Sequence, residues 1–344
     1  MKETYEKYIQ EGWLDCQRHP EFPLLILDYS RQTQFERKWD PITLKCRGLV
    51  TTEDFVPLNN PLPKFFNMEE LTTLPVGKFK TFDKLDGSCG TTYYWGGQHH
   101  IATRGSFASE QALFADNLLK TKYAHIELDP TLTYIFEIIY PENWIVVRYD
   151  GFSDIVLTAV RDTNGDLDIN HFKNLGFSVV QEYPHRDFKQ MKQLNLPNKE
   201  GFVVLFESGE RMKIKFTDYC ELHANRFNLS SKTVFCAFEQ NIPVGKFIEG
   251  FPDEFDTWIT KTHEGFETQY LGLFEEIFQL WLKVNHIGDK KAYVGATKAL
   301  NPTRVQFGAL MVLWGDKPRW DNLHEMLIKS MKSELEFQKG IPLV

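Results

Sequence analysis

The sequence predicts an α+β protein in which a β-rich part is followed by a helical part. Between residues 78 and 216, short apolar segments of strand length alternate with turn signals such as Asp-Gly and Ser-Gly. From residue 253 onward, large apolar side chains instead recur at spacings of three and four, which places them on one stripe of an amphipathic helix. A chain of 344 residues is long enough for two domains. We therefore expect one domain over residues 1–240 and an all-α domain over residues 241–344.

The composition is that of a globular protein, with 42% hydrophobic and 25% charged residues, which excludes a disordered or fibrous chain. Five scattered cysteines without a CxxC pair indicate reduced thiols and argue against a structural zinc site. No apolar run approaches the roughly 18 residues of a membrane span, and the first residues lack the apolar segment of a signal peptide. We therefore expect a cytoplasmic protein, in the host cytoplasm if the source is viral. The net charge of −8 argues against non-specific coating of nucleic acid, but allows an enzyme with a local basic pocket.

The first 67 residues predict a mixture of helix, strand and extended loop. The expected elements are, in order, a helix over 3–16, a strand over 24–27, a strand over 45–50 and an extended, proline-flanked loop over 61–67. Tyr29 follows the first strand, Arg47 begins an Arg-Gly turn that the second strand enters, and Lys64 lies in the loop. Taken singly, Arg47 and Lys64 are ordinary surface cations.

The next two predicted strands, residues 78–82 and 91–95, enclose a lysine two residues before Asp-Gly. Because side chains alternate along a strand, Lys84 and Asp86 are expected to face the same side. Gly87 permits a sharp turn and lets a phosphate approach the backbone closely. This arrangement suits a lysine nucleophile that attacks a nucleotide phosphate. A charged Asp-Gly hairpin turn is the simpler alternative.

Beyond this turn, a strand over residues 99–104 ends at Arg104, and Ser109 is expected to cap a helix with Glu110 in its first turn. The predicted buried face of that helix consists of Leu113, Ala115, Leu118 and Leu119. Further strands are expected over residues 132–140, 144–149 and 154–161, before an irregular stretch over 162–199.

Charged residues interrupt two of the predicted strands. Glu137 divides the apolar strand over 132–140, and burying a lone carboxylate is unfavourable, so it faces a polar site or has a structural partner. Residues 200–216 read as a hairpin through Ser208-Gly209, and Lys213 and Lys215 lie two apart on one face of its second strand. Two parallel ammonium groups repel each other, and an anion between them would remove that repulsion.

Read in order, these motifs resemble those of the covalent nucleotidyltransferases, the superfamily of polynucleotide ligases and RNA-capping enzymes. The chain is most similar to the phage-type RNA ligase 1 family, which the tRNA-repair ligase of T-even bacteriophage typifies. The residues that carry the resemblance are Cys46-Arg47-Gly48, Lys64-Phe65-Phe66-Asn67, Lys84-Leu85-Asp86-Gly87-Ser88, Ser109-Glu110-Gln111-Ala112-Leu113, Phe136-Glu137, Glu200-Gly201-Phe202, Lys213-Ile214-Lys215 and Leu222-His223.

The resemblance implies an antiparallel-sheet, ATP-grasp-like nucleotidyltransferase domain followed by an all-α domain that selects the RNA substrate. It also implies a three-step reaction. Lys84 attacks the α-phosphate of ATP to give a lysyl-AMP adduct, AMP passes to an RNA 5′-phosphate, and an RNA 3′-hydroxyl then displaces AMP. A monomer acting on RNA ends, such as those of a nicked tRNA, is expected.

Residue roles follow from the same resemblance. The expected nucleotide-binding set is Tyr29, Arg47, Lys64, Asp86, Arg104, Glu137, Lys213 and Lys215. Within it, the two strand lysines would contact the α-phosphate, Arg47 and Lys64 the pyrophosphate, and Glu137 the ribose. Glu200 would lie near the nucleophile and a metal ion, Mg²⁺ or Mn²⁺.

Three alternatives stay open on the sequence. A guanylyltransferase or a DNA ligase would be expected to carry an oligonucleotide-binding β-barrel after the Lys-x-Lys strand, whereas the sequence predicts helices over 253–284, 288–300, 303–314 and 318–337. A catalytically silent RNA-end binder would have no need of Lys84.

The sequence departs from the family pattern at one position. The family offers a metal-binding carboxylate early in its C-terminal part, and this carboxylate has no counterpart around Pro243-Val244.

Overall fold

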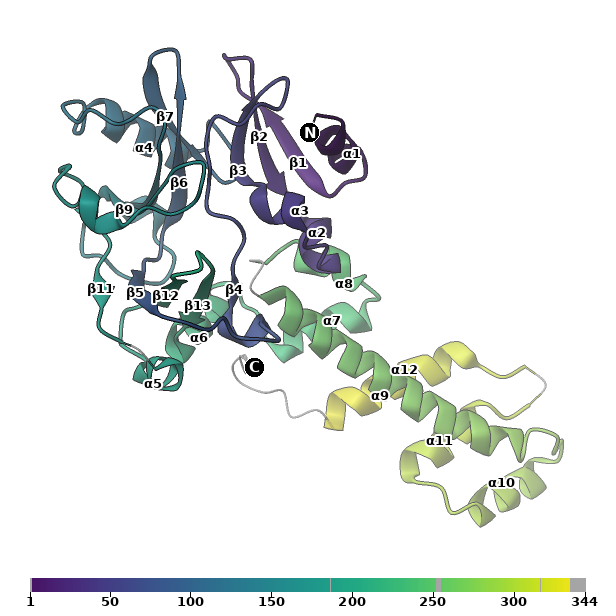
Figure 1. The fold of residues 1–344 in the computed structure, drawn as a ribbon. Coiled ribbons are helices and arrows are strands. Elements are labelled where there is room, and N and C mark those ends of the chain that lie inside the picture. Colours follow the sequence, from purple (N-terminus) through teal and green to yellow (C-terminus); the bar gives the residue numbers. More distant parts are fainter. Residues whose placement is uncertain (1, 186, 252–254, 316, 335–344) are drawn as a thin grey trace. The chain divides into compact units, whose positions relative to one another are not determined.

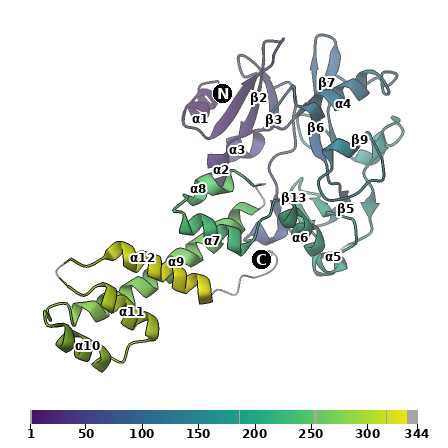
Figure 2. The same ribbon diagram turned by 180° about the vertical axis from the view of Figure 1, so that it is seen from behind.

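The computed structural model describes residues 2–185, 187–251, 255–315 and 317–334, and it divides between His223 and Ala224. Figures 1 and 2 show the β-rich first unit and the helical second unit. The division precedes the expected boundary near residue 240 because helix α7 (Ser231–Glu239) packs within the second unit. Its Phe235 ring lies 5.1 Å, centroid to centroid, from Phe266 of α9 (Asp256–Leu282).

The first unit contains three sheets, in which most neighbouring strands are antiparallel. The sheets have the strand orders β1-β2-β3, β10-β9-β8-β6-β7 and β11-β5-β12-β13-β4. Parallel pairs occur between β10 and β9 and between β13 and β4. The strands are β1 (Leu14–Arg18), β2 (Leu24–Tyr29), β3 (Arg47–Thr52), β4 (Phe66–Asn67), β5 (Phe79–Lys84), β6 (Ser88–Trp95), β7 (Gln98–Thr103), β8 (Thr133–Ile139), β9 (Asp154–Arg161), β10 (Ser178–Val179), β11 (Glu182–Tyr183), β12 (Gly201–Phe206) and β13 (Arg211–Lys215).

Helices accompany these sheets, and one of them covers the sheet that contains β6. The helices are α1 (Lys2–Gln10), α2 (Arg31–Glu36), α3 (Pro41–Lys45), α4 (Glu110–Lys120), α5 (Phe188–Leu194) and α6 (Thr217–Arg226), the last of which spans the division. The predicted cap of α4 is confirmed, because the Ser109 side chain accepts a hydrogen bond from the Ala112 amide. Ala115 and Leu119 are buried, but the expected inward position of Leu113 is wrong, since that side chain is 57% exposed. The mixed helix-and-sheet class is thus established, while the ATP-grasp-like description stays a prediction.

Three local predictions are wrong, each because a neighbouring segment competes for the backbone. The predicted helix over 3–16 ends at Gln10, and residues 14–18 pair with β2 instead. Lys45 ends a helix, so the strand begins only at Arg47. The predicted strand over 144–149 is a loop that follows a short 3₁₀ turn, Pro141–Asn143.

The predicted hairpin is confirmed, and its register brings distant charged residues together. Strand β12 pairs with both β5 and β13, so that Gly201 lies opposite both Lys84 and Lys215. Gly201 has a φ of +153°, and a Cβ there would lie 2.0 Å from the carbonyl oxygen of Ile214. Only glycine therefore permits this close pairing, which sets Glu200 beside the two lysines.

The second unit is built from helices, as predicted. They are α7, α8 (Val244–Ile248), α9, α10 (Lys290–Ala299), α11 (Arg304–Val312) and α12 (Trp320–Glu334). Two apolar clusters hold α9 to α10–α12, and in one of them the buried Tyr293 hydroxyl donates to the Leu310 carbonyl at 2.8 Å. Residues 253–254 and 335–337 of the predicted helices lie outside the described residues. Over the part of the chain that is described, no helix is both long and apolar enough to cross a membrane.

Substitution of Gly201 by alanine is expected to lower the free energy of unfolding by more than about 3 kcal/mol, because the new Cβ collides with backbone. Gly209 offers a matched control, since its φ is +85° but a Cβ there meets nothing within 4 Å. Gly209→Ala should therefore cost only about 1 kcal/mol from backbone conformation. Urea unfolding of both variants measures the difference. Equal losses would show that steric contact at Gly201 is unimportant.

Candidate active site

A single carboxylate oxygen joins the candidate nucleophile to a second lysine. Glu200 Oε1 lies 2.8 Å from Lys84 Nζ and 2.8 Å from Lys215 Nζ. The Glu200 side chain is 3% exposed and that of Lys215 is 9% exposed, whereas Lys84 retains 21%. Glu200 thus contacts two of the other three residues predicted to be catalytic, and Lys84, the candidate nucleophile, is the most accessible of the three in contact.

The segment that carries Lys84 connects two sheets and is not a hairpin turn. Lys84 ends β5, and Ser88 begins β6 in the other five-stranded sheet. A Cβ at Gly87 would lie 2.5 Å from the Ile138 carbonyl oxygen and 3.2 Å from Glu137 Cγ. Gly87 thus lets the segment pass directly against the strand that carries Glu137, which excludes the simple hairpin alternative.

Asp86 anchors this segment through its carboxylate. The residue is 4% exposed, and Oδ2 accepts hydrogen bonds from the amides of Val146 and Val147 at 2.8 and 2.7 Å. Oδ1 accepts from the Tyr219 hydroxyl at 2.8 Å, and the Tyr149 hydroxyl accepts from the Asp86 amide at 2.8 Å. This geometry supports a positioning role, and direct nucleotide contact by Asp86 stays a prediction.

Glu137 faces a cavity of about 220 Å³ whose walls include Arg47, Phe65, Lys84 and Val203. Burial raises the pKa of Glu137 to about 7, and the Lys84 charge opposes that shift. Among the charged groups that act on Glu137 are also Glu200, which raises its pKa further, and Arg47, which lowers it. The polar-site interpretation of Glu137 therefore agrees with its surroundings.

A second group of predicted residues surrounds the hydroxyl of Tyr29, a residue that is only 3% exposed. Arg104 donates to it at 2.9 Å and Lys64 at 3.3 Å. Arg104 Nε also donates to Asp28 Oδ2 at 2.7 Å, and Lys64 Nζ donates to Gln34 at 2.9 Å. The structure brings Tyr29, Lys64 and Arg104 together, and their role toward a nucleotide stays a prediction.

Phe65 was not predicted as a site residue, although it follows Lys64 directly. Its ring lies between two predicted cations, with Arg47 Cζ 5.7 Å and Lys213 Nζ 5.9 Å from the ring centroid. Cations at these distances are attracted to the ring face. Phe65 and Arg47 line the cavity, and Phe65 thus connects the cavity with Lys213.

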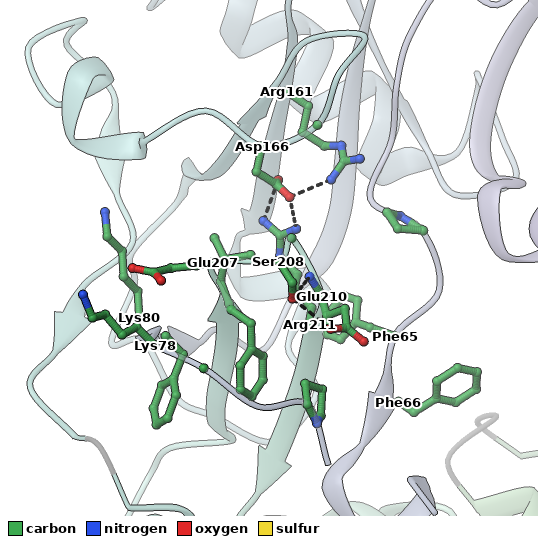
Figure 3. Close-up of a pocket in the computed structure, with 18 of the residues that line it drawn as sticks. Phe65, Phe66, Lys78, Lys80, Arg161, Asp166, Glu207, Ser208, Glu210 and Arg211 are labelled. Carbon is green, nitrogen blue, oxygen red and sulfur yellow. Dashed lines mark hydrogen bonds and ion pairs between the residues drawn. The ribbon is translucent and has the colours of Figure 1, made fainter. Parts of the chain in front are cut away.

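Arg211 was also missed, although its spacing was visible in the sequence. It precedes Lys213 by two residues, so Arg211, Lys213 and Lys215 share one face of β13. Asp166 binds the Arg211 guanidinium through both oxygens, at 2.6 and 2.7 Å, and accepts from Arg161 at 2.9 Å (Figure 3). Arg211 lines the same cavity as Lys84 and Glu137.

The described residues contain no group of three His, Cys, Asp or Glu side chains that could hold a metal ion. Glu200, the predicted metal contact, is occupied by two ammonium groups. The residues present therefore do not form a metal site by themselves, and the assignment of Glu200 to a metal stays a prediction.

Comparison with known proteins finds ligases, while no protein-family model matches the chain. The chain is 28% identical over 274 residues to a protein of Autographa californica nuclear polyhedrosis virus described as a "Putative bifunctional polynucleotide kinase/RNA ligase". The match covers 68% of this chain and 38% of the viral protein, so the chain spans well under half of that relative's length.

Two solved structures are also similar. An archaeal ATP-dependent RNA ligase matches over 97% of this chain and 80% of its own, with a TM-score of 0.47 and 12% identity. A "Putative ATP-dependent DNA ligase" from Aquifex aeolicus matches over 88% of each chain, with a TM-score of 0.45 and 15% identity. Likenesses at these scores do not by themselves establish a function.

The raised pKa of Glu137 predicts a pH-dependent contribution to stability. The carboxyl ionises near 4.5 in the unfolded chain but near 7 in the folded protein, so between these values the folded protein binds more protons. The free energy of unfolding therefore falls as the pH rises through this window, by up to about 3 kcal/mol from this residue. Urea unfolding of the wild type and of Glu137→Gln at several values between about pH 5 and pH 8 gives the free energy of unfolding of each protein. The difference between the two free energies should change across this range.

Glu142→Gln provides the matched control, because Glu142 is an exposed carboxylate in the same region. The free energy of unfolding of Glu142→Gln should change with pH in the same way as that of the wild type. If the free energies of unfolding of the wild type and Glu137→Gln differ by the same amount at every pH, the raised pKa assigned to Glu137 is wrong.

Proposed function

We propose that this chain is an ATP-dependent RNA ligase that joins RNA 5′-phosphate and 3′-hydroxyl ends. The observation that carries the proposal is the contact of Lys84, in its Lys-x-Asp-Gly segment, with Glu200, which also binds Lys215. The sequence similarity to a viral protein whose name includes RNA ligase supports it. The activity expected has three steps. AMP is transferred from ATP to Lys84 and then from Lys84 to the RNA 5′-phosphate. AMP is released when the RNA 3′-hydroxyl displaces it and the strand is sealed.

In the first step, Lys84 Nζ forms a bond to the α-phosphorus of ATP while the bond to pyrophosphate breaks. The attacking amine must lose a proton, and Glu200 Oε1 at 2.8 Å is placed to accept it. Lys215, on the other side of Glu200, and Lys213 on the same strand face provide positive charge for the phosphate in the transition state. In this proposal, the bound nucleotide takes the place of part of the ion pairing among Lys84, Glu200 and Lys215.

The other residues have roles in binding. Glu137 would accept hydrogen bonds from the ribose in the cavity beside Lys84, and Arg47 beside Phe65 would receive the pyrophosphate. Lys64, with Tyr29 and Arg104, would bind at the outer phosphates. Mg²⁺ or Mn²⁺ would arrive bound to the phosphates of ATP and keep most of its water ligands, since the described residues form no cage for it. We assign no step to the metal.

More specific parts of the proposal concern the family, the first domain, the substrate and the oligomeric state. We propose membership of the phage-type RNA ligase 1 family, an ATP-grasp-like first domain and action on a nicked tRNA. The helical unit would select the RNA, with Lys290, Lys291, Lys298 and Arg304 as candidate contacts on α10 and α11. A monomer is expected.

Structure and site favour an RNA ligase over the alternatives. After β13, the described residues form helices and no β-barrel of the kind expected for a guanylyltransferase or a DNA ligase. A silent RNA-end binder would not require a partly exposed lysine held against a buried carboxylate.

Lys84→Ala should abolish covalent AMP labelling, because the nucleophile is removed, yet still seal RNA that is already 5′-adenylated. Incubation with labelled ATP, followed by denaturing electrophoresis, measures the first activity, and joining of pre-adenylated RNA measures the second. Lys173→Ala, at an exposed lysine of the same unit, should retain both. Labelling that persists without Lys84 would refute the assignment of the nucleophile.

Glu200→Gln should slow lysyl-AMP formation by about 10²-fold or more, because the amide keeps the shape of the side chain but cannot accept the proton. Single-turnover labelling with excess ATP isolates this step. Glu142→Gln, an exposed change of the same kind, should leave the rate unchanged. A Glu200→Gln enzyme that labels at the wild-type rate would exclude proton transfer to this residue.

A further inference from the structure

A large cleft meets the cavity beside Lys84. It has a volume of about 1310 Å³, and Phe65 and Arg211 line both hollows. Figure 3 shows the side chains around it, with Lys78 and Lys80 on one wall and Arg211 and Phe65 on the other. The volume exceeds the roughly 300–1,000 Å³ of a typical small-molecule site, so the cleft has room for a polymer segment.

The cations of β13 lead from the candidate nucleophile into this cleft. Arg211, Lys213 and Lys215 occupy alternate positions on one face, while Met212 and Ile214 are buried on the other. Four residues of strand place Arg211 about 13 Å from Lys215 along the sheet. The row therefore extends past the two lysines assigned to the first step.

The far end of the row contains two buried guanidinium groups that bind the same carboxylate. Arg211 and Arg161 share the one carboxylate of Asp166, and the three side chains are only 8–10% exposed. Arg161 Nε is buried and has no hydrogen-bond partner among the described residues. The charge of Asp162 also acts on Arg161, but Asp166 is the carboxylate that both guanidinium groups bind. Guanidinium groups placed in this way can also bind a phosphate.

The cleft as a whole, with these three residues included, is balanced in charge and partly apolar. Five basic side chains and five carboxylates line it, and Lys80 is bound to Asp168 at 2.9 Å. The partly exposed rings of Phe65 and Phe66 add apolar wall. Unpaired bases can lie against such a wall, whereas a duplex hides its base faces.

Resting on the proposed function, we infer that this cleft holds the single-stranded end of the RNA substrate, with Arg211 bound to a backbone phosphate. Asp166 and Arg161 are positioning residues that hold the Arg211 guanidinium at the junction. Bases lie along the Phe65 and Phe66 side, and the RNA end reaches Lys84 past Lys213.

The test uses a fluorescently labelled short single-stranded RNA with a 5′-hydroxyl and a 3′-phosphate, which cannot be ligated. Anisotropy titrations of the full chain between about 50 and 200 mM salt give its affinity and its salt dependence. Arg211→Gln should weaken binding several-fold and reduce the slope of log K against log salt by about 0.7, the value for one phosphate contact on a single strand. Arg211→Lys should restore the slope.

Two further variants complete the test. Lys78→Gln, at an exposed cleft residue remote from the assigned chemistry, should weaken RNA binding while lysyl-AMP formation is unchanged. Lys173→Gln, an exposed lysine that does not line the cleft, should change neither measurement. A blunt RNA duplex should bind more weakly and respond little to Arg211→Gln.

Unchanged RNA affinity and salt slope in both Arg211→Gln and Lys78→Gln would overturn the inference, whatever their thermal stability. A lower melting temperature with an unchanged slope would assign Arg211 a structural role only, and a raised KM for ATP without an RNA effect would assign it to the nucleotide. A duplex that binds as tightly as the single strand, and loses the same slope, would refute a single-stranded occupant. Absence of lysyl-AMP in the wild type would refute the proposed function instead.

Discussion

The ion triplet of Lys84, Glu200 and Lys215 is the constraint on which the β-rich unit depends. Two ammonium groups approach one carboxylate oxygen, each at 2.8 Å, in a place where the carboxylate is almost fully buried. Without Glu200, two cations would face each other with little water to separate them. The arrangement requires β5, β12 and β13 to pair in one register, and Gly201 is the residue that allows their close approach.

The Asp86 carboxylate provides the second constraint, because it holds the segment that crosses between the sheets. Its partners come from a loop, through the amides of Val146 and Val147, and from α6, through the Tyr219 hydroxyl. A buried carboxylate with several donors is well satisfied and resists movement. The segment that carries Lys84, the candidate nucleophile, is therefore held firmly, while the Lys84 side chain stays 21% exposed.

Charge is distributed unevenly over this acidic chain. The net charge is −8, yet Arg211, Lys213 and Lys215 form a row along one strand, and Lys64 and Arg104 converge on one tyrosine. In general, a local concentration of cations attracts anions, while a negative remainder of the surface limits indiscriminate binding. The cleft that Arg211 lines differs from these groups, because five basic side chains and five carboxylates line it.

Sequence alone determined the features that depend on neighbours along the chain. The Ser109 cap, the hairpin around Ser208-Gly209 and the helices from α9 onward follow from short-range spacing. The Lys-x-Asp-Gly segment made Lys84 the candidate nucleophile. Local hydrogen bonds and side-chain periodicity depend on consecutive residues, so the sequence pattern reveals them directly.

Only the tertiary structure decided what pairs across long distances. The apolar run at 144–149 has the composition of a strand, but two of its amides bind Asp86 about 60 residues away. The family resemblance placed Glu200 near Lys84, but only the structure shows that one of its oxygens binds both Lys84 and Lys215. Nothing in the sequence indicated that Asp166 binds Arg211. These contacts arise from strand register and sheet packing, which bring together residues whose separation along the chain carries no local signal.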